Sequence, residues 1–249
     1  MVYFEGNLLI DQVQGHHNML EQLVHNFAGL FLVFASIVSI LIVYKNFRGS
    51  TVVWPTVMAG MMAVGFIGLG DLGEHLLSGI SPFPHESLHY LHMIGGPVAL
   101  FLFYSGLKEF TTKDAKPLGN LKLSLILLGT LLVPMVLATQ ADQRWDPDIE
   151  GPFLVLTAIP TIILALLVLL KAKPSFEVHS TVVLNISFTS IAITLLTLSL
   201  FIARMGDVNL MDNASMYVVG HALADIMHSA TATSILMFGI VTEGLIRSL

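Results

Sequence analysis

Histidines recur at helical spacing in one short stretch of this chain. In the sequence HESLHYLHM, His85, His89 and His92 are separated by four and then three residues, so a helix presents them on one side. Pro82 and Pro84 precede the stretch and favour a helix that begins near His85. Neutral imidazole is a common ligand of transition metals. The spacing therefore indicates a row of candidate metal ligands.

Two further stretches combine histidine with aspartate at similar spacing. The sequence GHALADIMHSATATS contains His221, Asp225 and His228 at offsets of four and seven, and GFIGLGDLGEHLL contains Asp71 and His75 four residues apart. A carboxylate one turn from an imidazole can bind the same ion or orient the ring through its other nitrogen. We expect Asp71 and Asp225 to act as a general base or as orienting groups. A purely structural role, in which Asp225 hydrogen-bonds a neighbouring helix, stays open.

The absence of cysteine limits the kind of metal site that the chain can build. With no cysteine in 249 residues, an ion would be held by imidazole, carboxylate or water. Zinc is the expected ion, with copper and iron as alternatives. The predicted metal ligands are His25, His75, His89, His92, His221 and His228.

The elements that position these residues are predicted to be transmembrane helices. Hydrophobic side chains make up 55% of the chain and charged ones 11%, which is typical of an all-α integral membrane protein. A helix needs about 20 apolar residues to cross a bilayer. Seven apolar runs of about that length lie at 25–44, 52–73, 87–107, 123–141, 153–170, 182–203 and 219–242.

The orientation of these spans follows from the distribution of basic residues. Nine of the eleven lysines and arginines fall in the loops and the tail on one side. Cytoplasmic loops retain such residues, so we expect the amino terminus outside, the carboxyl terminus inside, and a multi-pass protein of the cell membrane. Residues 1–24 lack the features of a removed signal peptide and are expected to form an extracytoplasmic segment. Residues 25–249 are expected to form a seven-helix domain.

This topology places the candidate residues at one end of the bundle. The end of the second span and the starts of the third and seventh spans lie in the same leaflet, and His25 opens the first span at that level. Glycines at 65, 68, 70 and 73 would allow a neighbouring helix to come close. Charged groups at this depth are costly unless they are paired, so a shared metal ion is expected.

The layout resembles the CREST superfamily of seven-span membrane metallohydrolases, which includes alkaline ceramidases and adiponectin-type receptors. Those proteins build a zinc site from the end of the second span and the starts of the third and seventh. Asp71 and His75 stand where the family has serine and histidine, and His221 and Asp225 where it has His-x-x-x-His. The resemblance implies a zinc ion and hydrolysis of an amide or ester bond in a lipid, with a carboxylate as general base.

Two other classes of function stay open at this point. Imidazoles of facing helices could bind copper or haem b in a redox subunit of a membrane complex. The histidines and the outer acidic loops could instead collect a metal ion for transport, or the histidines could sense pH. Membrane lipid is the expected partner, with a homo-oligomer or complex subunits as further partners. The net charge of −6 and the absence of a basic stripe argue against nucleic acid.

Overall fold

The computed structural model describes residues 19–47, 54–76, 85–112, 116–139, 147–172, 176–206, 211 and 213–247. Within these ranges the secondary structure is helical, which confirms the all-α prediction for the described residues. The seven helices are α2 (Met19–Phe47), α3 (Trp54–Leu76), α4 (His85–Thr111), α5 (Asn120–Ala138), α6 (Pro147–Ala172), α7 (Phe176–Met205) and α8 (Ala214–Arg247).

Each of these seven helices is long and apolar enough to cross a membrane. Five of the helices extend beyond the apolar runs at both ends, whereas α3 begins at Trp54 and α5 ends at Ala138, inside the runs 52–73 and 123–141. For example, α8 begins at Ala214, ahead of the run that starts at residue 219. The run marks only the part of a helix that fits the hydrocarbon layer, whereas the helix itself continues among polar residues. The candidate spans are Leu23–Asn46, Pro55–Gly73, Ser87–Glu109, Asn120–Ala138, Gly151–Ala172, Val183–Met205 and Ser215–Val241.

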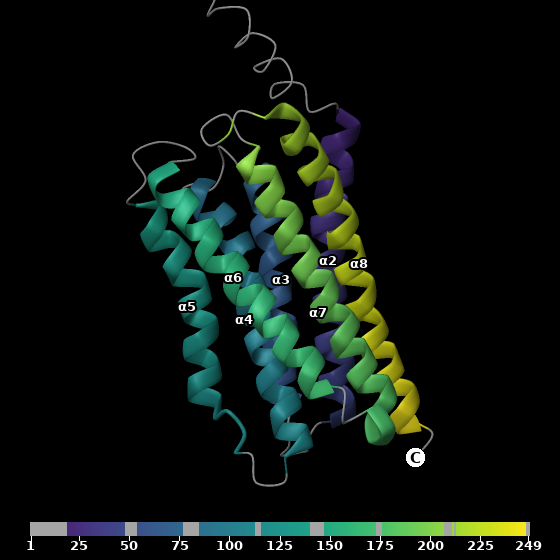
Figure 1. Cartoon of the computed structure of the whole chain (residues 1–249). Coiled ribbons are helices and arrows are strands. Elements are labelled where there is room, and N and C mark those ends of the chain that lie inside the picture. The colour runs from purple at the N-terminus through teal and green to yellow at the C-terminus, as the bar shows by residue number, and fades with distance from the viewer. Residues whose placement is uncertain are drawn as a thin grey trace, which may run out of the picture.

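The helices form a bundle in which the first and the last of the described helices pack together (Figure 1). α2 contacts both α3 and α8, α3 contacts α4, and α7 contacts α8. α6 contacts α4 and α7, whereas α5 lies at the edge of the bundle, mainly against α4. The helices that carry the predicted site residues, α2, α3, α4 and α8, are therefore linked by direct packing.

Glycines in α3 permit close approaches to both α2 and α4. A Cβ atom at Gly70 would lie 2.6 Å from the backbone nitrogen of His92 in α4, and one at Gly68 would lie 2.7 Å from the carbonyl oxygen of Gly29 in α2. Contacts this short exclude a side chain. The prediction that these glycines bring neighbouring helices close is confirmed at both positions. Asp71, which follows Gly70 in the chain, is thereby held near both α2 and α4.

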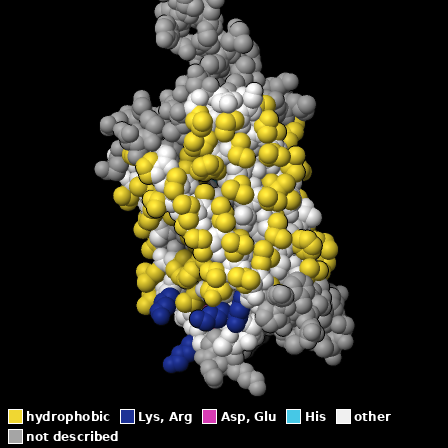
Figure 2. Space-filling view, in the orientation of Figure 1, with side chains coloured by type: hydrophobic (Ala, Val, Ile, Leu, Met, Phe, Trp, Pro, Cys, Tyr) yellow, Lys and Arg dark blue, Asp and Glu magenta, His cyan; other side chains and the backbone are white. Residues whose placement is uncertain are grey.

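Apolar side chains cover the face of the bundle that Figure 2 shows, and basic ones gather at one end of it. Lys45, Lys108 and Lys171 lie in the last turns of α2, α4 and α6, the end opposite the starts of these helices. The prediction that this end faces the cytoplasm rests on these lysines and their neighbours in the loops. The exposed apolar side chains of α2 include Leu23, Phe27, Leu30, Phe34, Ile37 and Leu41.

Candidate metal centre

Asp71, His92 and His228 come together inside the bundle and are called the candidate triad below. Asp71 lies near the end of α3, His92 near the start of α4 and His228 in the first half of α8. One potential ligand atom from each lies within 4.8 Å of the other two. Nε2 of His92 lies 3.0 Å from Nε2 of His228. Oδ1 of Asp71 lies 3.7 Å from Nδ1 of His92 and 4.0 Å from Nε2 of His228.

The candidate triad is almost completely removed from solvent. Asp71, His92 and His228 are 1%, 3% and 0% exposed. Polar and charged groups in such surroundings are costly unless a partner or an ion compensates them. Among the described residues, Oδ2 of Asp71 has no hydrogen-bond partner. Burial and unused acceptor capacity together favour a bound cation.

The spacing of the candidate triad suits an ion held by two imidazoles and one carboxylate. Ligand atoms about 2.0–2.1 Å from a tetrahedral zinc ion lie about 3.3 Å from one another. The two Nε2 atoms, 3.0 Å apart, are close to this separation. Oδ1 of Asp71 lies 4.0 Å from Nε2 of His228, so it would need to move by less than about 1 Å to reach this separation from that nitrogen. Three protein ligands leave a coordination position open, as in catalytic rather than structural zinc sites.

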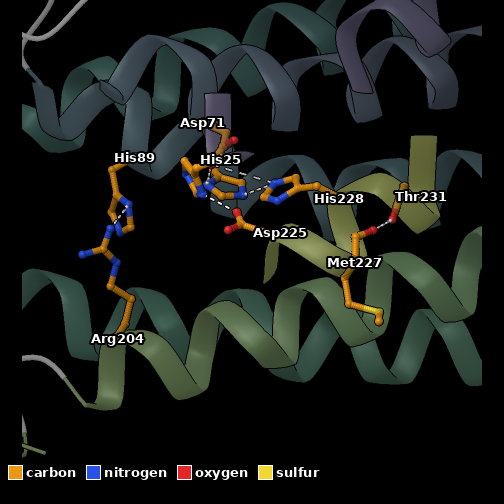
Figure 3. A network of polar contacts seen from close by, with 9 residues as sticks. His25, Asp71, His89, Arg204, Asp225, Met227, His228 and Thr231 are labelled. Atoms are coloured by element: carbon orange, nitrogen blue, oxygen red, sulfur yellow. Dashed lines mark hydrogen bonds and ion pairs between the residues drawn. The ribbon is translucent and has the colours of Figure 1, made fainter. Parts of the chain in front are cut away.

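His25, near the start of α2, lies between two carboxylates. Its Nε2 is 2.7 Å from Oδ1 of Asp71, and its Nδ1 contacts Oδ1 of Asp225 in α8. Figure 3 shows these three side chains pointing toward one another, with His228 beside them. A ring nitrogen that donates to a carboxylate offers no lone pair to an ion. His25 therefore lies as a partner of Asp71 and Asp225 in this structure, and its role as a metal ligand stays a prediction.

His89 is directed toward Arg204 at the end of α7. Nη2 of Arg204 lies 2.9 Å from Nδ1 of His89, and both side chains are buried. A guanidinium group has only donors, so Nδ1 of His89 accepts this hydrogen bond with the lone pair that a metal would need. Figure 3 shows the pair apart from the residues around Asp71. The structure therefore separates His89 from His92, although the sequence places both on one stripe of α4.

His221 lies near His25 and is not a member of the candidate triad. Its ring packs against Tyr217, with ring centroids 4.4 Å apart, and its centroid lies 6.2 Å from that of His25. Asp225, one turn further along α8, contacts His25 rather than an imidazole of the triad. The side chain of His75 lies outside the described residues, so its role as a ligand stays a prediction.

Gly29 supports the site and was not indicated by the sequence. A Cβ atom at this position would lie 2.6 Å from Oδ2 of Asp71, so only glycine leaves room for the carboxylate. Gly29 follows His25 by one helical turn and therefore lies on the same face of α2. That spacing becomes informative only once His25 is known to face Asp71. Arg204 carried a clearer signal, because it is one of the two basic residues that do not lie on the side that holds the other nine.

No protein-family model matches this chain, and neither the curated proteins nor the solved structures contain a significant match to it.

Proposed function

We propose that this chain is a multi-pass membrane metalloprotein that holds one divalent ion through Asp71, His92 and His228. The observation that carries the proposal is the meeting of two buried imidazoles and a buried carboxylate, from three different helices, within 4.8 Å. A divalent cation would balance the buried carboxylate and would replace the hydrogen bond between the two facing Nε2 atoms with a bond from each imidazole to the ion. Zinc is the ion we expect, because it accepts this donor set with one position left open.

The reaction we propose is hydrolysis of an amide or ester bond in a lipid or another amphiphile. A zinc ion with an open position polarises a carbonyl group and acidifies bound water. The site lies toward one end of apolar helices, where a substrate with an acyl chain and a polar head can be accommodated. The same three elements, the end of α3 and the starts of α4 and α8, supply the zinc site of the CREST superfamily that the sequence resembles. Here His228 joins the candidate triad, rather than His221 at the position that the resemblance favoured.

The donor set also supports a second candidate function, a redox centre with iron or copper. Two histidines and one carboxylate form the ligand set of many non-haem iron oxygenases, and imidazole also suits copper. Haem b fits this pair of histidines poorly, because a porphyrin would have to lie between two Nε2 atoms that are 3.0 Å apart.

Metal analysis of the purified protein tests the shared site. We expect about one zinc ion per chain, because only one candidate group is found among the described residues. The variants His92→Ala and His228→Ala should each lose the ion, since three ligands share it. The control His89→Gln should keep it, because glutamine can still accept the hydrogen bond from Arg204. Loss in only one of the two alanine variants would contradict a shared ion.

The type of metal and a turnover assay separate the two functions. Zinc without visible absorption, together with cleavage of fluorogenic N-acyl or O-acyl amphiphiles in detergent micelles, would support hydrolysis. Iron or copper in a one-to-one ratio to the chain, with the absorption spectrum of that metal, would favour the redox function over hydrolysis. Zinc-loaded protein that cleaves neither class of amphiphile would contradict the hydrolase proposal while leaving the metal site intact.

A further inference from the structure

We propose that His25 and Asp225 are positioning residues, which fix the carboxylate of Asp71 in the orientation that the metal ion requires. The inference rests on the proposed metal site and assigns a role to two residues outside the candidate triad. Its basis is a continuous row of contacts from Asp225 in α8, through His25 in α2, to Asp71 in α3 (Figure 3).

The same oxygen of Asp71, Oδ1, contacts His25 and would bind the ion. Oδ1 lies 2.7 Å from Nε2 of His25 and is also the oxygen nearest the other two members of the triad, at 3.7 Å from His92 and 4.0 Å from His228. Rotation of the carboxylate would therefore break the contact with His25 at the same time as it turned Oδ1 away from the two imidazoles. His25 thus opposes the rotation that would disassemble the site.

Helix α2 also restrains the second oxygen of Asp71. Oδ2 lies against Gly29, where a Cβ atom would be only 2.6 Å away. His25 and Gly29 are one turn apart on the same face of α2, so one helix face holds the carboxylate from both sides. In this arrangement Asp71 would offer the ion one oxygen, Oδ1, in a fixed position.

Asp225 fixes the orientation of the His25 imidazole. It contacts Nδ1 of His25, so the ring cannot turn about its own axis without losing one of its two carboxylate partners. Asp225 precedes His228 by three residues on α8 and lies on the same side of that helix. The same turn of α8 therefore carries both the proposed ligand His228 and Asp225, which holds His25 in contact with Asp71.

Groups that orient metal ligands affect the affinity of the ion without touching it. Loss of such a partner commonly weakens metal binding by about 10–100-fold. A residue that only stabilised the bundle would lower the unfolding temperature but would leave the ligand geometry around a bound ion unchanged. Affinity and ligand geometry are therefore the two quantities that distinguish positioning from a structural role.

Cobalt(II) is the probe, because its visible absorption reports coordination geometry while it occupies zinc sites. The detergent-solubilised full chain is titrated with Co²⁺ as the wild type and as His25→Gln, Asp225→Asn and Asp225→Ala. We expect His25→Gln and Asp225→Ala to weaken Co²⁺ binding by about 10–100-fold and to change the spectrum. Asp225→Asn should retain part of the affinity, because its amide oxygen can still accept a hydrogen bond from His25. His89→Gln, a buried histidine on α4 outside the triad, is the matched control and should bind as the wild type does.

The outcomes separate this inference from the proposed metal site. Wild-type affinity and spectrum in His25→Gln and Asp225→Ala would overturn the positioning role and leave the metal site standing. A wild-type protein that does not bind Co²⁺ would overturn both. Thermal unfolding of each variant identifies any that fails to fold, and in that case the milder Asp225→Asn decides. An Asp225→Asn variant with the affinity and spectrum of the wild type then overturns the proposal.

Discussion

Among the single side chains of the site, Asp71 has the largest number of roles. It contributes the only carboxylate of the candidate triad, it contacts His25 in α2, and it lies against Gly29. The sequence alone indicated Asp71 because a charged residue deep in an apolar span needs a compensating partner. It did not indicate which imidazoles provide that partner, because the rotation of each helix about its axis depends on packing.

A substitution at Gly29 tests the space that Asp71 requires. In Gly29→Ala the new methyl group would lie 2.6 Å from Oδ2 of Asp71, so the carboxylate must move. We expect a loss of about 1–3 kcal/mol in the free energy of unfolding, as for other overpacked sites. We also expect weaker Co²⁺ binding, by about tenfold or more, since Asp71 leaves its position.

Gly129 provides the matched control for this substitution. It lies in α5, and a Cβ atom there would meet nothing within 4 Å. Gly129→Ala should therefore leave Co²⁺ affinity unchanged and should not lower stability, because alanine favours helix. Equal Co²⁺ affinities in the two alanine variants would show that Gly29 is not needed to accommodate Asp71.

At the level of the helices, the sequence predicted which elements form but not how they face one another. Seven apolar runs predicted seven spans, and the structure has seven suitable helices among its described residues. On α4 the same stripe carries His89 and His92, yet the first turns to Arg204 and the second to His228. A stripe covers an arc wide enough to meet two neighbours, so spacing alone could not separate ligands from other buried histidines.

The direction in which the helices cross the membrane is a separate prediction at this scale. The chain has no cysteine, so single cysteines can be introduced without background labelling. A membrane-impermeant maleimide added to intact cells should label Asn213→Cys, just before α8. It should label Lys116→Cys, between α4 and α5, only after permeabilisation. The reverse pattern would contradict the orientation inferred from the lysines.

For the whole molecule, the candidate triad joins parts of the chain that are far apart in sequence. Asp71 and His228 come from the second and the last of the described helices, and His25 adds the first. The packing of α2 against α8, the first and the last of the described helices, makes this possible. An ion bound here would therefore link α3 and α4 to α8, the last of the described helices.

This link predicts that metal stabilises the folded bundle. An ion that binds only the folded state at 100 times its dissociation constant adds about 2.7 kcal/mol to the free energy of unfolding. We expect Zn²⁺ to raise the unfolding temperature of the detergent-solubilised protein and a chelator to lower it. Asp71→Asn, which keeps the volume of the side chain but loses its charge, should abolish the response. A chelator that leaves the wild-type unfolding temperature unchanged would contradict a bound structural or catalytic ion.

X-ray absorption at the metal edge of the purified protein tests the central claim most directly, because it reports the atoms around the ion itself. The proposed site predicts scattering from two imidazole rings, with nitrogen and oxygen ligands at about 2.0–2.2 Å. His228→Ala is expected to lose the ion, so this signal should disappear in that variant. A spectrum without imidazole scattering, or one that is the same in the wild type and in His228→Ala, would contradict the account.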